Sequence, residues 1–441
     1  MKRVLIYSQN LEPGDLRCMR ALAQRLLRSS GQVQLGVISG TPASAEAPEW
    51  RGIECITLAG VRAPNAVPQA ARRPALTLGA VLQLRLQSIR NAISEFAPDL
   101  LLVDKMPFGM YDELSKVLAT LTGQAAAPKC VLLLRDLIGC PQRTAQQWRE
   151  RGYFDAISKH YEKVLVLGER EVFDLRREYS MPDNAAAKLE YCGYMAAAPG
   201  RSERVRVRRA LGVNGNEPLV LVTAGHGHDG EALIRHYLDG LKSIPAGARP
   251  RSHIVCGEGM RESERLALAC AAHALPQVTF QHVSRDVMSL MSAADVVVAN
   301  GSYQKTCELL TLRCRAVVVP ASAEGTEQTL RAERLAAHGL LRLIRPAELQ
   351  AQRLVAAVLG ELLEGGADAQ APGPCSVSGI EFVTSTLLGL MNLEAEAESR
   401  GGVPSGSDGA TVVASDSGFD LSLRIPQETG SFGPARASTM H

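Results

Sequence analysis

The chain has 441 residues, of which 46% are hydrophobic and 21% charged, as is typical of a soluble globular protein with two or three domains. Its 48 basic and 46 acidic residues leave a formal net charge of +2, so the charge does not indicate nucleic acid as a partner. The ten cysteines include no Cys-x-x-Cys pair, which argues against a zinc ribbon or a disulfide framework. Because the sequence lacks an apolar run of about 20 residues and a signal-peptide pattern, we expect a cytoplasmic protein.

Short apolar runs alternate with helical patterns through the first half of the chain. The runs predict strands at 4–8, 33–39, 54–60, 99–104, 129–136, 163–169 and 188–194. Helical spacing follows the first run at Leu16, Met19, Ala23 and Leu26, and another helix is predicted near 78–95. Continuous Val and Leu runs separated by helices indicate a parallel sheet that is covered on both faces.

The same alternation restarts after residues 196–217, a connector rich in Ala, Arg, Gly and Pro that ends in a short helix. Strands are predicted at 218–225, 252–257, 278–283, 295–300 and 315–320, with helices at 230–242, 260–273, near 326–338 and near 346–364. We therefore predict an α/β fold with two doubly wound domains, residues 1–195 and 218–365, whose sheets leave a cleft between their carboxyl ends.

The tail, residues 366–441, has a different composition. It is rich in Gly, Ser, Pro and Asp, but Ile380, Val383, Leu387 and Leu390 form one apolar stripe. The stripe predicts a helix near 379–393 that packs back on the body of the protein. The remainder has too few apolar residues to fold, and we expect it to be disordered.

A glycine-rich turn opens the second half. In VLVTAGHGHDGEALIRHYL a strand runs into Gly225, Gly227 and Gly230, and a helix begins at once. Glycines there would let the backbone approach a diphosphate closely, although a tight turn without a ligand has the same pattern. His226 and His228 suggest a metal pair, but no further ligand lies at metal spacing, so we predict no metal site.

A second turn of this kind follows the run VVVA at 296–299. Ser302 is a candidate N-cap, and Lys305 lies in the first helical turn, where a cation opposes the helix dipole. A bound phosphate would remove that conflict, and Glu308 one turn later could then bind a ribose. In the alternative interpretation, Lys305 and Glu308 form an ion pair with each other.

Residues 278–341 resemble the C-terminal domain of glycosyltransferase family 28, the family of the peptidoglycan N-acetylglucosaminyltransferase. The segment GSYQKTCE at 301–308 is similar to the motif G-G-Y-N-T-x-C-E of one branch of that family. It is followed, as in the family, by a Val-Val-Pro strand, a Glu-Gln pair and an R-A-x-R-L helix. The first half agrees with the same branch in PDLLLVDKMPFG at 98–109 and LLRDLIGCP at 133–141.

The resemblance implies two Rossmann-like domains in the GT-B arrangement, with a nucleotide sugar, UDP-linked, bound by the C-terminal domain. It implies that Glu308 binds the ribose, that Glu327 and Gln328 lie near the sugar, and that the turn at Val283 lies near the base. The backbone of 225–230 and 301–303 would hold the diphosphate. The implied donor-binding residues are Gly225, Gly227, Gly230, Val283, Gly301, Ser302, Tyr303, Lys305, Glu308, Glu327 and Gln328. The implied chemistry is glycosyl transfer with inversion, without a metal or another cofactor.

The first half departs from the family at two histidines. Asp15 stands where the family's first loop carries the His that is the usual candidate for activating the acceptor hydroxyl, and Lys105 replaces a second His. Asp15 and Asp104 are therefore the candidate bases, although a carboxylate needs a raised pKa for that role. Alternatively, Asp15 only caps a helix that begins at Leu16.

These substitutions keep three functions open. The protein is an active glycosyltransferase with an unknown, soluble or lipid-linked, acceptor, or a catalytically impaired partner that binds nucleotide sugars. An epimerase of the same fold is the third, but it needs acidic and His residues that the sequence does not place. Residues 67–90 mix Arg with Leu and indicate either a peripheral contact with the inner face of an anionic membrane or a helix that covers the first sheet.

Overall fold

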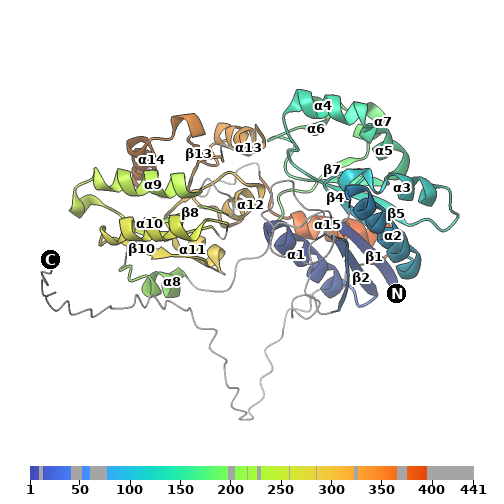
Figure 1. Cartoon of the computed structure of the whole chain (residues 1–441), viewed down its shortest axis with the longest axis horizontal. Coiled ribbons are helices and arrows are strands. Elements are labelled where there is room, and N and C mark those ends of the chain that lie inside the picture. The colour runs from blue at the N-terminus through green and yellow to red at the C-terminus, as the bar shows by residue number, and fades with distance from the viewer. Residues whose placement is uncertain are drawn as a thin grey trace, which may run out of the picture. The chain divides into compact units, whose positions relative to one another are not determined.

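The structure is a computed structural model. It describes residues 1–8, 13–40, 52–59, 77–196, 204–215, 217–225, 230–257, 259–284, 286–321, 326–364 and 375–394, without the side chains of 13–17 and 326. The described residues belong to one compact unit, Met1–Ala397, and form two parallel sheets with helices on both faces (Figure 1). The predicted α/β fold with two doubly wound sheets is confirmed.

The first sheet has the strand order β3-β2-β1-β4-β5-β6-β7, and all its strands are parallel. Its strands are β1 (Lys2–Ser8), β2 (Val33–Ser39), β3 (Ile53–Thr57), β4 (Leu100–Asp104), β5 (Lys129–Arg135), β6 (Lys163–Leu167) and β7 (Leu189–Tyr191). Its helices are α1 (Pro13–Ser29), α2 (Leu78–Phe96), η2 (Met110–Asp112), α3 (Ser115–Thr122), α4 (Pro141–Glu150), α5 (Tyr153–His160), α6 (Leu175–Glu178) and α7 (Asp183–Ala186).

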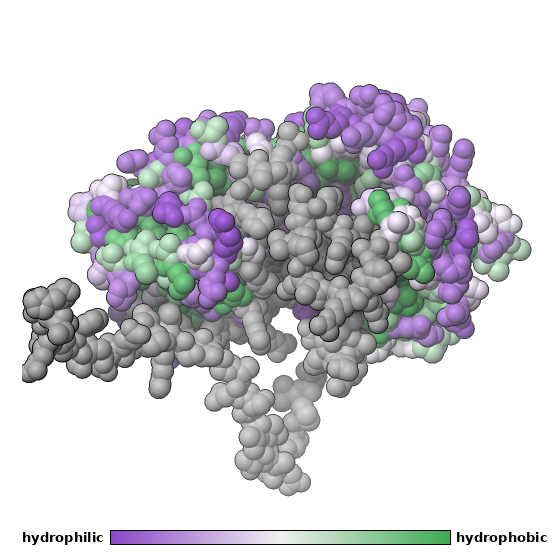
Figure 2. All heavy atoms as spheres, viewed as in Figure 1, coloured by the Kyte–Doolittle hydropathy of each residue, from purple (hydrophilic) through white to green (hydrophobic). Residues whose placement is uncertain are grey.

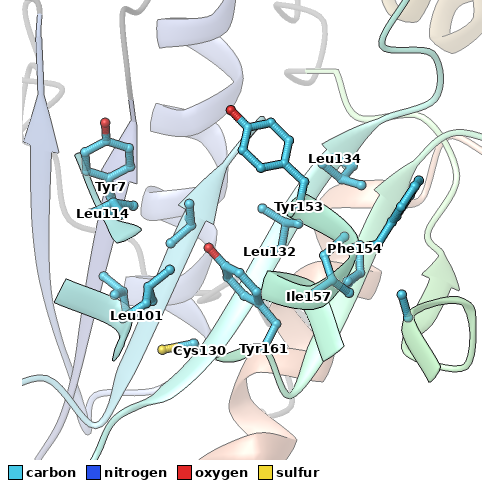
Figure 3. Close-up of a cluster of buried hydrophobic side chains, with 14 of the residues drawn as sticks. Tyr7, Leu101, Leu114, Cys130, Leu132, Leu134, Tyr153, Phe154, Ile157 and Tyr161 are labelled. Atoms are coloured by element: carbon cyan, nitrogen blue, oxygen red, sulfur yellow. The ribbon is translucent and has the colours of Figure 1, made fainter. Parts of the chain in front are cut away.

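Both faces of the first sheet are buried, which is why its strands read as uninterrupted apolar runs. Leu5 and Tyr7 of β1 belong to one apolar cluster, and Val4 and Ile6, which point to the opposite face, belong to another. Figure 3 shows part of the first cluster, in which aromatic side chains such as Tyr153 gather over the sheet.

The second sheet has the order β10-β9-β8-β11-β12-β13, again all parallel. Its strands are β8 (Leu219–Thr223), β9 (Arg251–Val255), β10 (Val278–Gln281), β11 (Val296–Ala299), β12 (Ala316–Val318) and β13 (Arg342–Leu343). Its helices are α9 (Gly230–Lys242), η3 (Ala246–Ala248), α10 (Glu262–His273), α11 (Val287–Ala293), α12 (Tyr303–Leu312), α13 (Thr326–Ala337), η4 (Pro346–Glu348) and α14 (Ala351–Leu363). The edge strand β13 was not predicted, because two half-buried residues leave no apolar run.

Two further helices lie outside the repeated pattern. The helix α8 (Arg204–Ala210) lies in the predicted connector, and Arg208 donates to the carbonyl of Ala293 at 3.0 Å, which fastens it to α11. The helix α15 (Gly379–Leu390) packs against α1 of the first half (Figure 1). The remainder of the tail, 395–441, for which disorder was predicted, lies outside the described residues.

The surface of the described residues is largely polar on the face shown in Figure 2, where hydrophilic side chains cover the region of α4 and α6. Among the helices of the described ranges, none is both long and apolar enough to cross a membrane. The second half of the segment considered for membrane contact, 78–90, lies in the helix α2 (Leu78–Phe96). Its Ile89 is buried against the first sheet, as are Ile93 and Phe96 further along the helix. Residues 60–76 lie outside the described part.

We predict that α15 is bound to the first half through its buried stripe. Leu387 is fully buried in the cluster that includes residues of α1, whereas Phe382 on the same helix is 37% exposed. Leu387→Ala should lower the free energy of unfolding by about 2–5 kcal/mol, because the cavity adds to the lost transfer free energy. Phe382→Ala removes more atoms and should cost clearly less. Urea denaturation measures both, and equal losses would contradict the docking of α15.

Candidate functional site

Each sheet has one place where the strand order reverses. In the first sheet β1 and β4 are neighbours: the strand that follows β1 in sequence lies on one side of this pair, and the strand that follows β4 lies on the other. In the second sheet the same holds for β8 and β11. In open α/β sheets, ligands bind beyond the carboxyl ends of the strands at such a switch point. The candidate site is therefore built from the residues that follow β1, β4, β8 and β11.

Glycines allow a close approach of the chain at the switch point of the second sheet. Gly225 follows β8 with φ +66°, and a Cβ atom there would lie 2.3 Å from Asn300 Nδ2. A Cβ atom on Gly230, the first residue of α9, would lie 2.4 Å from that of Ala224. The structure thus requires glycine at two of the three predicted positions, whereas Gly227 lies outside the described residues together with His226 and His228.

Asn300, which sequence reasoning did not select, fixes the contact between the two strand ends. Its Nδ2 donates to the carbonyl of Ala224 at 3.0 Å, and this bond sets the orientation of the amide. Its Oδ1 is buried and accepts no hydrogen bond from the residues that the structure describes. The available signal was its place directly after the run VVVA.

The turn after β11 starts a capped helix, as predicted. Ser302 Oγ accepts a hydrogen bond from the backbone N–H of Lys305 at 3.3 Å, so Ser302 is the N-cap of α12. A Cβ atom on Gly301 would lie 3.3 Å from the carbonyl oxygen of Gln328, so the start of α13 lies directly against this turn. A carboxyl-end turn followed by a helix N-terminus presents backbone N–H groups to an anion.

Lys305 and Glu308 form an ion pair, which is one of the two interpretations of their spacing. Lys305 Nζ lies 2.6 Å from Glu308 Oε2, and Gln304 Nε2 donates to Glu308 Oε1 at 3.0 Å. Both charged side chains are buried. Each oxygen of the Glu308 carboxylate therefore already accepts a hydrogen bond within α12.

Tyr303 connects the second half of the chain to the first. Its hydroxyl donates to the carbonyl of Leu167, at the end of β6, at 3.1 Å. The guanidinium groups of Arg135 and Arg331 lie 5.1 and 5.2 Å from the centre of its ring. Burial raises the pKa of Tyr303 well above its ordinary value, so the hydroxyl stays neutral and donates. The side chain of Tyr303 thus lies at the junction of the two halves. The prediction that residues 301–303 hold the diphosphate concerns the backbone of Tyr303 and not this side chain.

Buried polar side chains gather at the switch point of the first sheet. Ser8, the last residue of β1, donates through Oγ to Asp104 Oδ2 at 3.1 Å, and Asp104 is the last residue of β4. Arg135 Nη1, at the end of β5, lies 3.3 Å from Asp104 Oδ1. The candidate base Asp104 is therefore held from two sides, between the two central strands.

The other candidate base, Asp15, lies in the first turn of α1. The helix begins at Pro13, so the prediction that Asp15 caps a helix starting at Leu16 is wrong. Proline suits the first helical position because its fixed φ matches the helix and its missing N–H is not needed there. The side chain of Asp15 lies outside the described part.

An ion pair that sequence reasoning missed joins the two halves. Arg331 of α13 donates through Nε and Nη2 to Asp136, which follows β5, at 2.9–3.1 Å, and Nη2 also donates to Glu327 at 2.6 Å. Tyr194, which follows β7, also donates to Asp136 at 3.2 Å. Although burial disfavours the charged guanidinium, Asp136 and Glu327 hold the pKa of Arg331 well above its ordinary value.

The remaining predicted residues lie on the second half. Gln328 is buried and its Oε1 accepts from the backbone N–H of Ala321 at 3.2 Å, beside the carboxyl end of β12. Glu327 is half-buried in the first turn of α13. Val283 follows β10 and is exposed. In the described part of the chain, no three His, Cys, Asp or Glu side chains lie close enough together to hold a metal ion.

The sequence of the second half matches a known family. Residues 219–376 match the model of the glycosyltransferase family 28 C-terminal domain. An uncharacterized glycosyltransferase of Methanopyrus kandleri is 28% identical over 155 residues, which are 35% of this chain. The match spans 41% of the length of that relative.

Solved structures share the fold of both halves. MurG from Acinetobacter baumannii superposes with a TM-score of 0.57 at 15% identity, over 88% of this chain and 100% of that chain. The calicheamicin glycosyltransferase CalG4 gives a TM-score of 0.57 at 14% identity, over 89% of this chain and 98% of that chain. A UDP-GlcNAc 2-epimerase from Neisseria meningitidis, bound to UDP-GlcNAc, gives 0.58 at 14% identity, over 89% of this chain and 100% of that chain.

At such identities the structural likeness shows the fold alone, and that fold is the two-domain, Rossmann-like GT-B arrangement. The predicted resemblance to glycosyltransferase family 28 is confirmed by the family match over residues 219–376.

Proposed function

We propose that this protein transfers a sugar from a UDP-linked donor to an acceptor hydroxyl with inversion at the anomeric carbon. The observation that carries the proposal is the switch point of the second sheet, where Gly225, Asn300 and the capped turn of α12 meet. All three lie inside the stretch that matches the family 28 domain. A likeness to transferases and to an epimerase alone does not distinguish between these reactions.

The diphosphate of the donor would lie at this switch point. The helices α9 and α12 begin at Gly230 and Tyr303, after the neighbouring parallel strands β8 and β11, so the positive ends of both helix dipoles lie toward the carboxyl ends of these strands and favour an anion there. During transfer, negative charge grows on the departing diphosphate. The same helix ends would stabilise this charge without a metal ion.

The ribose would bind at Glu308, in keeping with the resemblance. Since Gln304 and Lys305 already donate to this carboxylate, a ribose hydroxyl would compete with one of them. The amide of Gln304 is the better candidate for displacement, because a neutral donor binds a carboxylate less strongly than an ammonium group does. Val283 would then lie near the base, and Glu327 and Gln328 near the sugar.

The acceptor would bind at the carboxyl edge of the first sheet. A hydroxyl that attacks the anomeric carbon must lose its proton, and Asp104 and Asp15 are the candidate bases. Asp104 lies at the switch point, held by Ser8 and Arg135, which fixes the direction of its carboxylate. A catalytically impaired protein that binds nucleotide sugars and serves as a partner is the alternative, since both family histidines are substituted.

We predict that UDP stabilises the folded protein more than other nucleoside diphosphates do. A ligand that binds only the folded state adds about 2.7 kcal/mol at a hundredfold excess over its dissociation constant. A thermal-shift panel of UDP, dTDP, GDP and ADP measures this effect. If none of the four raises the melting temperature, the donor site is not at this switch point.

Gly225 allows a sharper test of the same site. Gly225→Ala places a Cβ atom against the Asn300 amide, and it also carries the strain of a positive φ. Gly212→Ala is the matched control, because Gly212 has a φ of +68° and no atom of the described residues lies within 4 Å of a Cβ atom there. We expect Gly225→Ala to weaken UDP binding about tenfold or more, as the loss of one good hydrogen bond does, and Gly212→Ala to leave it unchanged. Calorimetric titration with equal affinities for the two variants would contradict a donor contact at Gly225.

The base is tested by neutralising each aspartate. Asp104→Asn or Asp15→Asn should lower turnover by roughly 10²–10⁴, while UDP affinity stays nearly constant, because proton transfer acts only in the transition state. Turnover of UDP-sugars is measured with water and with soluble and lipid-linked acceptors. Parent-like turnover in both variants would remove these aspartates from the mechanism. Tight donor binding by the parent without turnover on any acceptor would favour the impaired partner.

A further inference from the structure

Arg331 has more hydrogen-bond donors than the ion pair at the junction uses. A guanidinium carries five N–H groups in a fixed plane. The Nε and Nη2 atoms donate to Asp136 and Glu327, but Nη1 is buried and has no hydrogen-bond partner among the residues that the structure describes. A buried N–H without a partner is costly, so such a group in a fully buried side chain indicates a polar partner that binds there.

The position of Arg331 relates it to the candidate donor site. The start of α13 lies against the turn at Gly301, since the carbonyl oxygen of Gln328 is 3.3 Å from where a Cβ atom on that glycine would be. Arg331 lies one turn further along α13 and contacts the end of β5 in the first half. If the diphosphate of the donor binds at this turn and its sugar points toward the first half, the sugar would therefore lie close to Arg331.

The charges around Arg331 favour a neutral partner. Arg331 and Arg135 are matched by Asp136 and Asp104, and Glu327 adds one more negative charge. A carboxylate or phosphate brought to this place would meet an excess of negative charge in a poorly solvated region. A hydroxyl or amide carbonyl oxygen can accept the Nη1 hydrogen bond without that repulsion.

We propose that Arg331 Nη1 binds a neutral oxygen of the sugar carried by the donor, so that Arg331 selects uncharged sugars and rejects uronic acids. This inference rests on the proposed function. It assigns Arg331 two roles: Nε and Nη2 hold the two halves together through Asp136, and Nη1 recognises the sugar. A purely structural role would include only the first.

The parent protein provides the first test, by calorimetric titration with UDP, UDP-glucose, UDP-N-acetylglucosamine and UDP-glucuronate. We expect the better of the two neutral sugars to bind about tenfold more tightly than UDP, as one charge-assisted hydrogen bond allows, and UDP-glucuronate to bind more weakly than either. Glucuronate binding as tight as that of the neutral sugars overturns the inference. If neutral sugars bind no better than UDP, the inference also fails, while the donor site stands.

The second test uses Arg331→Lys, with Arg334→Lys as the matched control. Lysine keeps a positive charge beside Asp136 but cannot reach Asp136, Glu327 and a sugar together. Arg334 lies on the same helix and pairs with Glu178 at 2.9 Å in a half-exposed position. Both variants are checked by thermal melting before titration.

We expect Arg331→Lys to bind UDP within about twofold of the parent but to lose the roughly tenfold gain from the sugar, whereas Arg334→Lys keeps it. An unchanged gain in Arg331→Lys overturns the inference. If this variant fails to fold, the inference is decided by the order of affinities that the parent protein shows for the four ligands. No binding of any of the four ligands by the parent overturns the proposed function and the inference together.

Discussion

The ion pair between Arg331 and Asp136 fixes how the carboxyl edge of the second sheet lies relative to that of the first. The proposed chemistry depends on this arrangement. The two residues are 195 positions apart, one on a helix of the second half and one at the end of a central strand of the first. A buried pair of this kind contributes little net stability, but removing one partner leaves an unpaired buried charge and costs about 3–5 kcal/mol. The contact is also bidentate, so it fixes an angle as well as a distance. A sugar bound by the second half would therefore meet an acceptor held by the first half in one orientation.

The carboxyl edges of the two sheets present different groups: backbone and helix ends at the second sheet, and buried charged side chains at the first. At the second sheet, Gly225, Gly230 and Gly301 allow backbone and helix ends to approach one another, which suits a diphosphate that is recognised through N–H groups. At the first sheet, Asp104 and Arg135 are buried side chains, which suit the handling of a proton and the orientation of a hydroxyl. Recognition of a diphosphate through the backbone depends on the spacing of glycines, and this spacing can be read directly from the sequence. The stretch that matches the family 28 C-terminal domain, 219–376, contains these glycines.

The same difference decides how much the sequence could predict. The parallel sheets were predictable because strands buried on both faces read as apolar runs, and the N-cap Ser302 was predictable because capping is local. The pair of Lys305 and Glu308 remained one of two interpretations, since a ligand and an ion pair require the same spacing. The contact of Arg331 with Asp136 could not be predicted, because only the folded chain brings together residues so distant in sequence. Asn300 was missed for a related reason: its partner, Ala224, follows a different strand, β8.

The loop after β4 is held in place at the carboxyl edge of the first sheet, where the acceptor is proposed to bind. Lys105, Tyr111 and Asp112 all have positive φ angles, a conformation that is strained for residues with side chains. Buried tyrosines hold the loop: Tyr7 accepts from the backbone N–H of Met110 at 3.0 Å, and Tyr153 donates to Asp112 at 2.6 Å. Burial, and after it Glu113, raises the pKa of Tyr7, so this phenol stays neutral within the network. The strain is thus offset by contacts that exist before a ligand arrives. In the proposed reaction Asp104 is a candidate base at the start of this loop, and a charge that is held in place in advance is the kind that contributes most to a transition state.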